Sequence, residues 1–235
     1  MRLLKLFTTD RPEMALGEIS AAAGLNKTTT HRLLRALQSE ALVQKNPATG
    51  AYSLGAGLMA LGVQALASSD LRRRVRPVLK RLAHETGETA TLEVPFENSM
   101  LILDEVAGSH VVGAAGNVGT RWPLHATSTG KVFLAFDAER LEALPDPLPA
   151  LTPKTLIEKS RFGPQLIEIR KRGFAETVDE LEDGFAAVAT VLRGALGDLQ
   201  GALSIGGPTR RLGAARRTEL GAALRRAAAR ISPDY

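Results

Sequence analysis

An α+β fold is the class that this sequence predicts, with an N-terminal winged helix-turn-helix joined by a helix to a larger domain built on an antiparallel sheet. Two short helical patterns meet at Gly24, and two strand-like runs follow at residues 42–54. Farther along the chain, strand-like and helical runs occur in separate blocks, with helical patterns at both ends of this part. Such blocks are typical of an α+β domain in which helices pack against a sheet.

The second helical pattern begins after Asn26 and has two distinct faces. At about 100° per residue, Leu33, Leu34 and Leu37 fall on one side and predict a packing face. The opposite face carries hydroxyl, imidazole and guanidinium groups, which suit base edges and phosphates. Asn26 is a preferred helix N-cap residue. The candidate DNA-binding residues of this segment are Asn26, Lys27, Thr28, Thr29, His31, Arg32 and Arg35.

Residues 42–54 contain two short strand-like runs around the turn-forming pairs Asn46-Pro47 and Thr49-Gly50. This arrangement is typical of the β-wing of a winged helix-turn-helix. Lys45 and Tyr52 flank the predicted tip, and we expect both to contact the sugar-phosphate backbone of DNA. A short helix-turn-helix also occurs as plain packing, but the wing and the cationic face favour DNA binding.

Positive charge is concentrated in the N-terminal part of the chain. Residues 1–54 carry seven Lys and Arg against four acidic residues, a net of +3, which leaves +2 of the total of +5 for the other residues. This higher charge density suits a nucleic-acid-binding domain. Cysteine is absent, which excludes disulfides and thiolate metal sites. No signal peptide or membrane span is evident, so we expect a cytoplasmic protein with no membrane partner.

We expect three segments: a DNA-binding domain at residues 1–54, a linking helix at 55–70 and a second domain at 71–235. The linking segment is rich in Ala, Leu, Gly and Met and uncharged before Asp70. A helix that is apolar on most sides must be covered. The favoured cover is the same helix of a second subunit, and packing on the chain's own second domain is the alternative. The arginine-rich run at 72–76 predicts a solvated helix face.

The second domain is expected to contain an antiparallel sheet, because short turns separate its strand-like runs. A basic amphipathic helix precedes the first strand, and another helix closes the chain. The expected strands span residues 89–94, 100–106, 111–114, 185–192 and 200–205, and the expected helices span 71–86, 130–136, 139–144, 164–172 and 212–231.

Motifs that suggest catalysis or cofactor binding are incomplete. Ser128-Thr129-Gly130-Lys131 is similar to the end of a P-loop, but His125 replaces the required first glycine. The four histidines show no metal-ligand spacing, and a pair of Ser128 or Ser204 with His125 lacks a nucleophile elbow. We therefore expect no catalytic residue, cofactor or metal, and a hydrolase or a stand-alone small-molecule-binding protein is the alternative. The helix start at 128–131 predicts either a small-anion site or a plain helix cap.

Taken together, these segments resemble the IclR family of bacterial transcription factors nearly end to end. The resemblance implies a winged helix-turn-helix, a linking helix that helps dimerisation and a GAF-like α/β effector domain that senses a small metabolite. It also implies a homodimer or dimer of dimers that binds double-stranded operator DNA as a repressor or an activator. The matching motifs are Glu18-Ile19-Ser20 through Gly24-Leu25, Thr30-x-Arg32-Leu33-Leu34, Tyr52-Ser53-Leu54-Gly55, Arg81-Leu82-Ala83-x-x-Thr86-Gly87-Glu88-Thr89-Ala90, Pro123-Leu124-His125-Ala126-Thr127, Gly130-Lys131, Arg170-x-x-Gly173-Phe174-Ala175 and Ala202-Leu203-Ser204-Ile205-x-Gly207-Pro208.

The resemblance further implies an effector pocket between the His-Ala-Thr loop and the late strands. Members that bind small keto acids carry aspartate, cysteine and a second serine where this chain has Thr177, Ala187 and Gly206. We therefore expect a larger or more apolar effector, an organic or aromatic acid. Members also commonly begin upstream of Met1, so this start is expected to weaken dimer contacts. The implied pocket residues are Ser128, Thr129, Thr177, Phe185, Ala187, Ser204 and Gly206.

Overall fold

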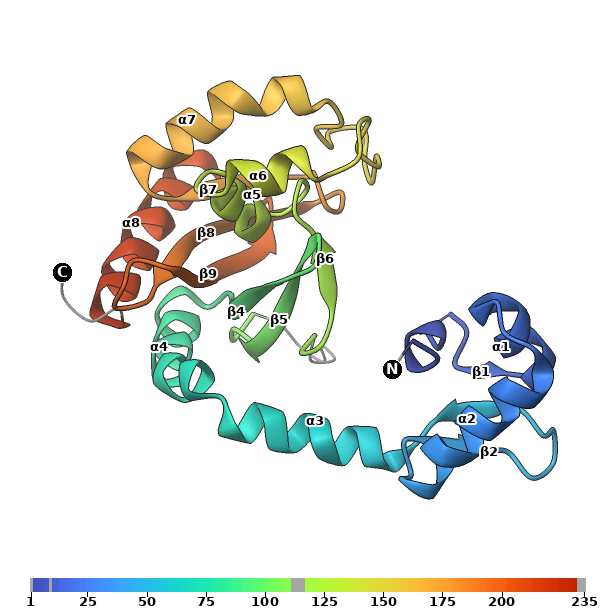
Figure 1. Ribbon diagram of the computed structural model, residues 1–235. Coiled ribbons are helices and arrows are strands. Elements are labelled where there is room, and N and C mark those ends of the chain that lie inside the picture. Colours follow the sequence, from blue (N-terminus) through green and yellow to red (C-terminus); the bar gives the residue numbers. More distant parts are fainter. Residues whose placement is uncertain (1, 9, 111–116, 232–235) are drawn as a thin grey trace. The chain divides into compact units, whose positions relative to one another are not determined.

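The computed structural model describes residues 2–8, 10–110 and 117–231, and the chain divides into two compact units, residues 1–69 and 70–235 (Figure 1). The first unit contains η1 (Leu4–Leu6), β1 (Glu13–Met14), α1 (Leu16–Ala23), α2 (Lys27–Ser39), β2 (Val43–Lys45), β3 (Tyr52–Leu54) and α3 (Ala56–Ser68). The second unit contains α4 (Asp70–Thr86), β4 (Thr89–Phe96), β5 (Ser99–Val106), β6 (Arg121–Pro123), α5 (Ser128–Leu134), α6 (Ala138–Glu142), η2 (Lys159–Arg161), α7 (Phe162–Arg172), β7 (Ala175–Val178), β8 (Phe185–Arg193), β9 (Leu199–Pro208) and α8 (Ala214–Ile231).

Helices α1 and α2 meet at a sharp turn. Gly24 has a φ of 65° there, a left-handed conformation that glycine reaches without steric cost. The Leu25 N–H then donates to the Ser20 carbonyl at 3.0 Å. The side-chain oxygen of Asn26 accepts from the Thr29 N–H at 2.8 Å and so caps α2. The helix-turn-helix predicted from the sequence is confirmed.

A small apolar core joins these helices to a three-stranded antiparallel sheet with the order β1-β3-β2. Ile19 of α1, Leu34 of α2 and Val43 of β2 are each at most 1 % exposed. Strands β2 and β3 form the predicted wing, whereas β1 is absent from the sequence-based prediction because it is only two residues long.

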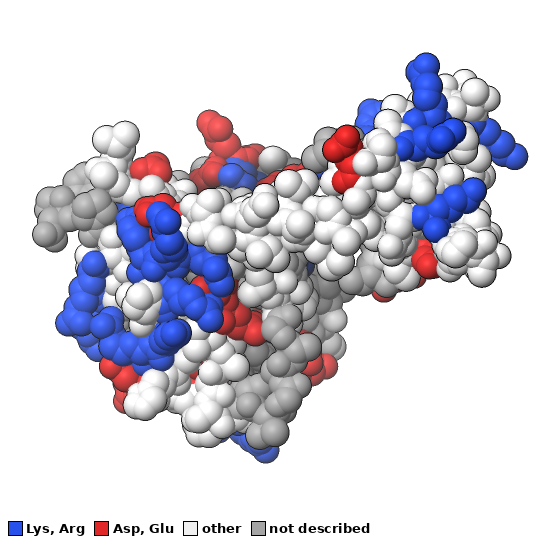
Figure 2. Space-filling view, turned by 90° about the horizontal axis from the view of Figure 1, so that it is seen from below, with Lys and Arg blue, Asp and Glu red and all other residues white. Residues whose placement is uncertain are grey.

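Helix α3 is apolar and open to solvent. None of its residues is buried by the described part of the chain, and Met59, Leu61 and Val63 are 68 %, 55 % and 65 % exposed. The helix carries no charged residue, so its surface is white in Figure 2. A helix of this kind needs a cover in the functional molecule. No helix in the described ranges is both long enough and apolar enough to cross a membrane.

A six-stranded antiparallel sheet forms the centre of the second unit, with the strand order β6-β5-β4-β9-β8-β7. Strands β4, β5, β8 and β9 confirm four of the predicted strands. The edge strands β6 and β7 were not predicted from the sequence. They have three and four residues, which are too few to display an alternating pattern. The strand expected at residues 111–114 lies outside the described residues.

The two faces of this sheet are covered by different helices (Figure 1). Helices α4 and α8 pack on one face, where Leu79, Leu92 and Leu224 are buried in one cluster. Helix α5 covers the other face and α7 packs on α5, and their cluster includes Phe133 and Phe162. Because side chains alternate along a strand, each central strand contributes residues to both faces.

Leu79 provides a test of this packing. Leu79→Ala is expected to lower the free energy of unfolding by about 2–5 kcal/mol, because a fully buried side chain is replaced by a cavity. Urea titration followed by the fluorescence of Trp122, the single tryptophan, reports on the second unit. Lys80→Ala, at the exposed neighbouring position, should change stability by no more than about 0.5 kcal/mol. Equal effects of the two substitutions would contradict the packing.

Candidate functional site

The surface of α2 presents the predicted cationic group to solvent. Lys27, Thr28, His31, Arg32 and Arg35 are all exposed, while Thr29 is half-buried near the helix start. Within the described ranges, no ion pair involves Lys27, Arg32 or Arg35. Their cationic groups are therefore available to an anionic partner such as a phosphate.

Tyr52 and Leu33 differ from their predicted positions. Tyr52 is only 2 % exposed, which contradicts the predicted contact of its side chain with DNA. It lies on the central strand β3 between Met14 of β1 and Lys45 of β2, so its neighbours enclose it. The Lys45 ammonium lies 5.6 Å from the centre of the Tyr52 ring and is the exposed member of this pair. Leu33, predicted to pack, is 39 % exposed at the edge of the apolar face.

A cavity of about 360 Å³ lies in the second unit between the sheet and α5. All the residues that the resemblance implied for the effector pocket line this one cavity, although they are far apart in the sequence. They are Ser128 and Thr129 of α5, Thr177 of β7, Phe185 and Ala187 of β8, and Ser204 and Gly206 of β9.

Strand register places the late pocket residues in one row. Ala187 is paired with Thr177 on one side and with Gly206 on the other, and Gly206 is paired with Thr89 of β4. A Cβ atom at Gly206 would lie 2.6 Å from the ring of Phe185. A serine at this position would therefore require the ring of Phe185 to move.

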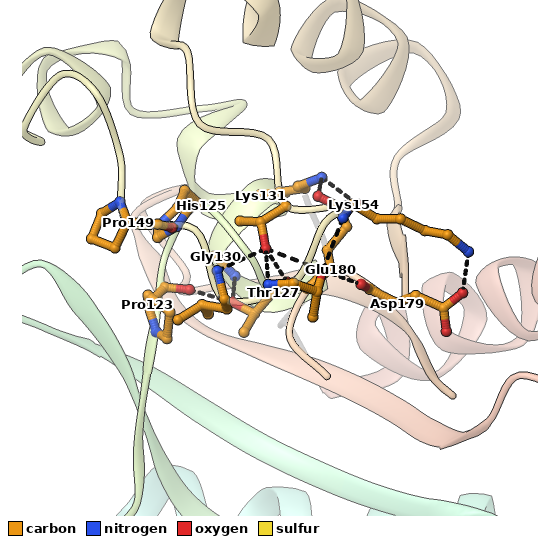
Figure 3. A network of polar contacts seen from close by, with 12 residues as sticks. Pro123, His125, Thr127, Gly130, Lys131, Pro149, Lys154, Asp179 and Glu180 are labelled. Carbon is orange, nitrogen blue, oxygen red and sulfur yellow. Dashed lines mark hydrogen bonds and ion pairs between the residues drawn. The ribbon is translucent and has the colours of Figure 1, made fainter. Parts of the chain in front are cut away.

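Hydrogen bonds fix the loop that leads into α5 (Figure 3). Thr127 Oγ1 accepts from the Gly130 N–H at 3.1 Å and donates to the Pro123 carbonyl at 3.0 Å. His125 Nε2–H donates to the Pro149 carbonyl at 2.8 Å, and burial lowers the pKa of the imidazole. The bond from the Gly130 N–H to Thr127 is that of a helix N-cap.

Lys131 and Glu180 form a partly buried ion pair beside the cavity (Figure 3). The Lys131 Nζ lies 2.6 Å from Glu180 Oε1 and 2.5 Å from Oε2, and Lys131 is fully buried. Burial lowers the pKa of Lys131 and raises the pKa of Glu180, because desolvation disfavours both charged forms. The pair ties α5 to the loop whose next residues, Leu181 and Glu182, line the cavity.

Glu93 of β4 is a cavity residue that the sequence analysis missed. It is 5 % exposed, and its carboxylate accepts from Thr91 Oγ1 at 3.0 Å and from Thr129 Oγ1 at 2.7 Å. Burial raises the pKa of Glu93, and the two hydroxyl hydrogen bonds partly oppose that rise. The polar alternation Thr89-x-Thr91-x-Glu93 on an otherwise apolar strand is the signal that could have found it. Trp122 of β6 also lines the cavity without having been predicted.

Family models match both units of the chain. The model for the IclR helix-turn-helix domain matches residues 1–47, and the model for the C-terminal part of the bacterial transcriptional regulator IclR matches residues 63–233. The chain belongs to the IclR family. Members of the IclR family are DNA-binding transcriptional regulators, so the exposed face of α2 and the cavity belong to a protein of that class.

Individual IclR-family relatives match nearly the whole chain. The glycerol operon regulatory protein of Streptomyces griseus is 36 % identical over 99 % of this chain and 92 % of its own length. The transcriptional repressor IclR of Escherichia coli strain K12 is 31 % identical over 100 % of this chain and 88 % of its own length.

Solved IclR-family structures share the fold. An IclR transcriptional regulator from Alicyclobacillus acidocaldarius has a TM-score of 0.83 at 29 % identity, covering 98 % of this chain and 94 % of the other. An IclR homolog from Microbacterium hydrocarbonoxydans, in complex with 4-hydroxybenzoate, has a TM-score of 0.77 at 26 % identity, covering 98 % and 95 %.

The buried carboxyl of Glu93 predicts a pH-dependent stability. The folded state holds the Glu93 proton more tightly than the unfolded chain, where the pKa is near 4.5. Stability from this group is therefore present below that pH and is lost as the pH rises through the folded pKa. Glu93→Gln is expected to be more stable than the wild type at neutral pH, and this advantage should vanish in acid.

Urea titrations between acidic and neutral pH measure the difference between the two proteins. Glu158→Gln, a substitution of an exposed glutamate, is the matched control and should follow the wild type at every pH. A stability difference at Glu93 that stays constant with pH would rule out the inferred rise of its pKa.

Proposed function

We propose that this chain is an effector-responsive regulator of transcription, which binds operator DNA through α2 and the wing and a small molecule in the cavity of the second unit. The observation that carries the proposal is the convergence of all seven implied pocket residues on one cavity. Lys27, Arg32 and Arg35 of α2, which form no ion pair within the described ranges, support the DNA-binding part of the proposal. A stand-alone small-molecule-binding protein does not need an exposed cationic face on α2.

Each residue of the DNA-binding group has a proposed role. Arg32 and Arg35, on the exposed face of the helix, are the candidates for reading base edges, since guanidinium groups bind guanine in a bidentate way. Lys27 and Lys45 are the candidates for phosphate contact. Asn26 uses its side-chain oxygen to cap the helix, so its role is to hold the helix start in place. Thr28, Thr29 and His31 complete the proposed surface.

A second copy of the chain is the proposed cover for α3. The exposed apolar residues of this helix, Met59, Leu61 and Val63, offer an uncharged surface that can pair with itself. A homodimer, or a dimer of dimers, would carry two copies of α2 to two operator half-sites, about 34 Å apart if they are separated by one turn of DNA. An effector that prefers one arrangement by about 1–3 kcal/mol would change operator affinity roughly 5–150-fold.

Catalysis is not part of the proposal. His125 is hydrogen-bonded to Pro149, and among the described residues it makes no hydrogen bond to Ser128 or Ser204. The chemical class of the effector is a separate question. The sequence predicts an organic or aromatic acid, and the relative in complex with 4-hydroxybenzoate supports that class. The relative named for a glycerol operon suggests a different chemistry.

DNA binding is tested by Arg32. Arg32→Ala is expected to weaken binding to the intergenic DNA beside the gene by about 1–3 kcal/mol, with a smaller loss on unrelated DNA. Lys45→Ala should weaken binding to the intergenic DNA and to unrelated DNA alike, and it should reduce the dependence of the affinity on salt concentration. Fluorescence anisotropy at matched salt measures these affinities, with Arg161→Ala, an exposed arginine of the second unit, as the control for charge. Wild-type affinity in Arg32→Ala would remove this residue from the interface.

Self-association is tested on α3. Val63→Asp is expected to convert the dimer to a monomer, because it places a charge in the proposed apolar contact while leaving the isolated chain little changed. Sedimentation velocity measures the mass of the particle. Ser68→Asp adds the same charge at the exposed end of the helix and should leave the dimer intact. A dimer that survives Val63→Asp would place the interface elsewhere.

A further inference from the structure

The cavity carries ionisable groups of one sign. Glu93, Glu105 and Glu182 line it, and its described walls include no Lys, Arg or His. Lys131, two residues after the cavity residue Thr129, is bound to Glu180 through both carboxylate oxygens. An acid that entered this cavity would therefore meet the carboxyl groups of Glu105 and Glu182, together with Glu93 in its ionised form, and like charges raise the free energy of an ionised acid.

Glu93 has unused capacity to accept hydrogen bonds. Each of its two oxygens accepts one bond from a described residue, Thr91 or Thr129, whereas a carboxylate offers about four acceptor sites. Because the group is almost fully buried, the remaining lone pairs gain most from a donor supplied by a molecule in the cavity. Hydroxyl groups are such donors, and carboxylates are not.

The rest of the wall combines hydroxyls with apolar side chains. Ser128, Ser204 and Thr177 each carry a hydroxyl that can donate or accept. Trp122 and Phe185 supply aromatic surface to the same cavity. A few polar groups set among apolar walls fix the orientation of a small ligand. Such walls suit a compact molecule that carries hydroxyl groups on a hydrocarbon skeleton.

We infer that the effector is a neutral molecule with several hydroxyl groups, of the polyol or monosaccharide kind, and that Glu93 selects it against the corresponding acid. The inference rests on the proposed function only in treating this cavity as the effector site. A neutral ligand replaces the organic or aromatic acid expected from the sequence. That expectation was made without the three glutamates that line the cavity. In this proposal the Glu93 carboxylate accepts hydrogen bonds from hydroxyl groups of the ligand, while the hydroxyls of Thr91 and Thr129 hold the carboxylate in place.

Calorimetry with matched alcohol and acid pairs tests this inference on the full chain without DNA. The pairs are glycerol and glycerate, arabitol and arabinonate, glucose and gluconate, and 4-hydroxybenzyl alcohol and 4-hydroxybenzoate. The wild type should bind at least one neutral polyol or sugar, and bind it at least tenfold more tightly than its acid partner. Glu93→Gln should reduce that preference at least tenfold, whereas Glu158→Gln should preserve it.

Several results would overturn the inference. These are tighter binding of an acid than of its neutral partner, binding of no polyol or sugar, and a preference unchanged in Glu93→Gln. If glucosamine binds more tightly than glucose, the cavity favours a cation, and the inference of a neutral ligand is wrong. If Glu93→Gln does not fold, Thr129→Val removes one of the hydroxyls that hold the carboxylate and should also reduce the preference. Because no DNA is present, a failure of operator binding leaves these results intact, and the converse also holds.

Discussion

Side chains on the adjacent strands β4 and β9 alternate between the apolar core and the cavity. Leu92 and Leu203 face α4 and α8, while Thr91 and Ser204, paired across the same two strands, face the cavity. A shift of register by one residue would exchange the two sets. The apolar core therefore determines which polar residues reach the cavity.

Buried charge is concentrated around the same cavity. Glu93 is held by hydroxyl groups, and Lys131 is held by Glu180. Burying an ionisable group without a full set of partners opposes folding, and the rest of the second unit is rich in apolar clusters that offset this cost. The combination is typical of a binding site, where the requirements of a ligand prevail over those of stability.

The long, regular elements were predictable from local pattern alone. The helix-turn-helix follows from Gly24, Asn26 and the two faces of α2, and the central strands follow from their apolar runs. Tyr52 was misplaced because its side chain packs in the apolar cluster of the first unit, together with residues distant in the sequence such as Ile19 and Leu34. Glu93 was missed because a charged residue on a strand is usually solvated. Its burial comes from α5, which is distant in the sequence and places Thr129 against it.

The central claim is that a ligand in the cavity changes the affinity for DNA. A substitution at Ala187, which lines the cavity, tests this claim directly. Ala187→Trp would fill the cavity from β8 and changes no residue of the first unit. The measurement is an operator titration by fluorescence anisotropy, with and without the polyol or sugar that binds most tightly to the wild type. The account predicts that this ligand changes operator affinity in the wild type and has no effect in Ala187→Trp, which should still bind the operator. An equal response of both proteins to the ligand would contradict it.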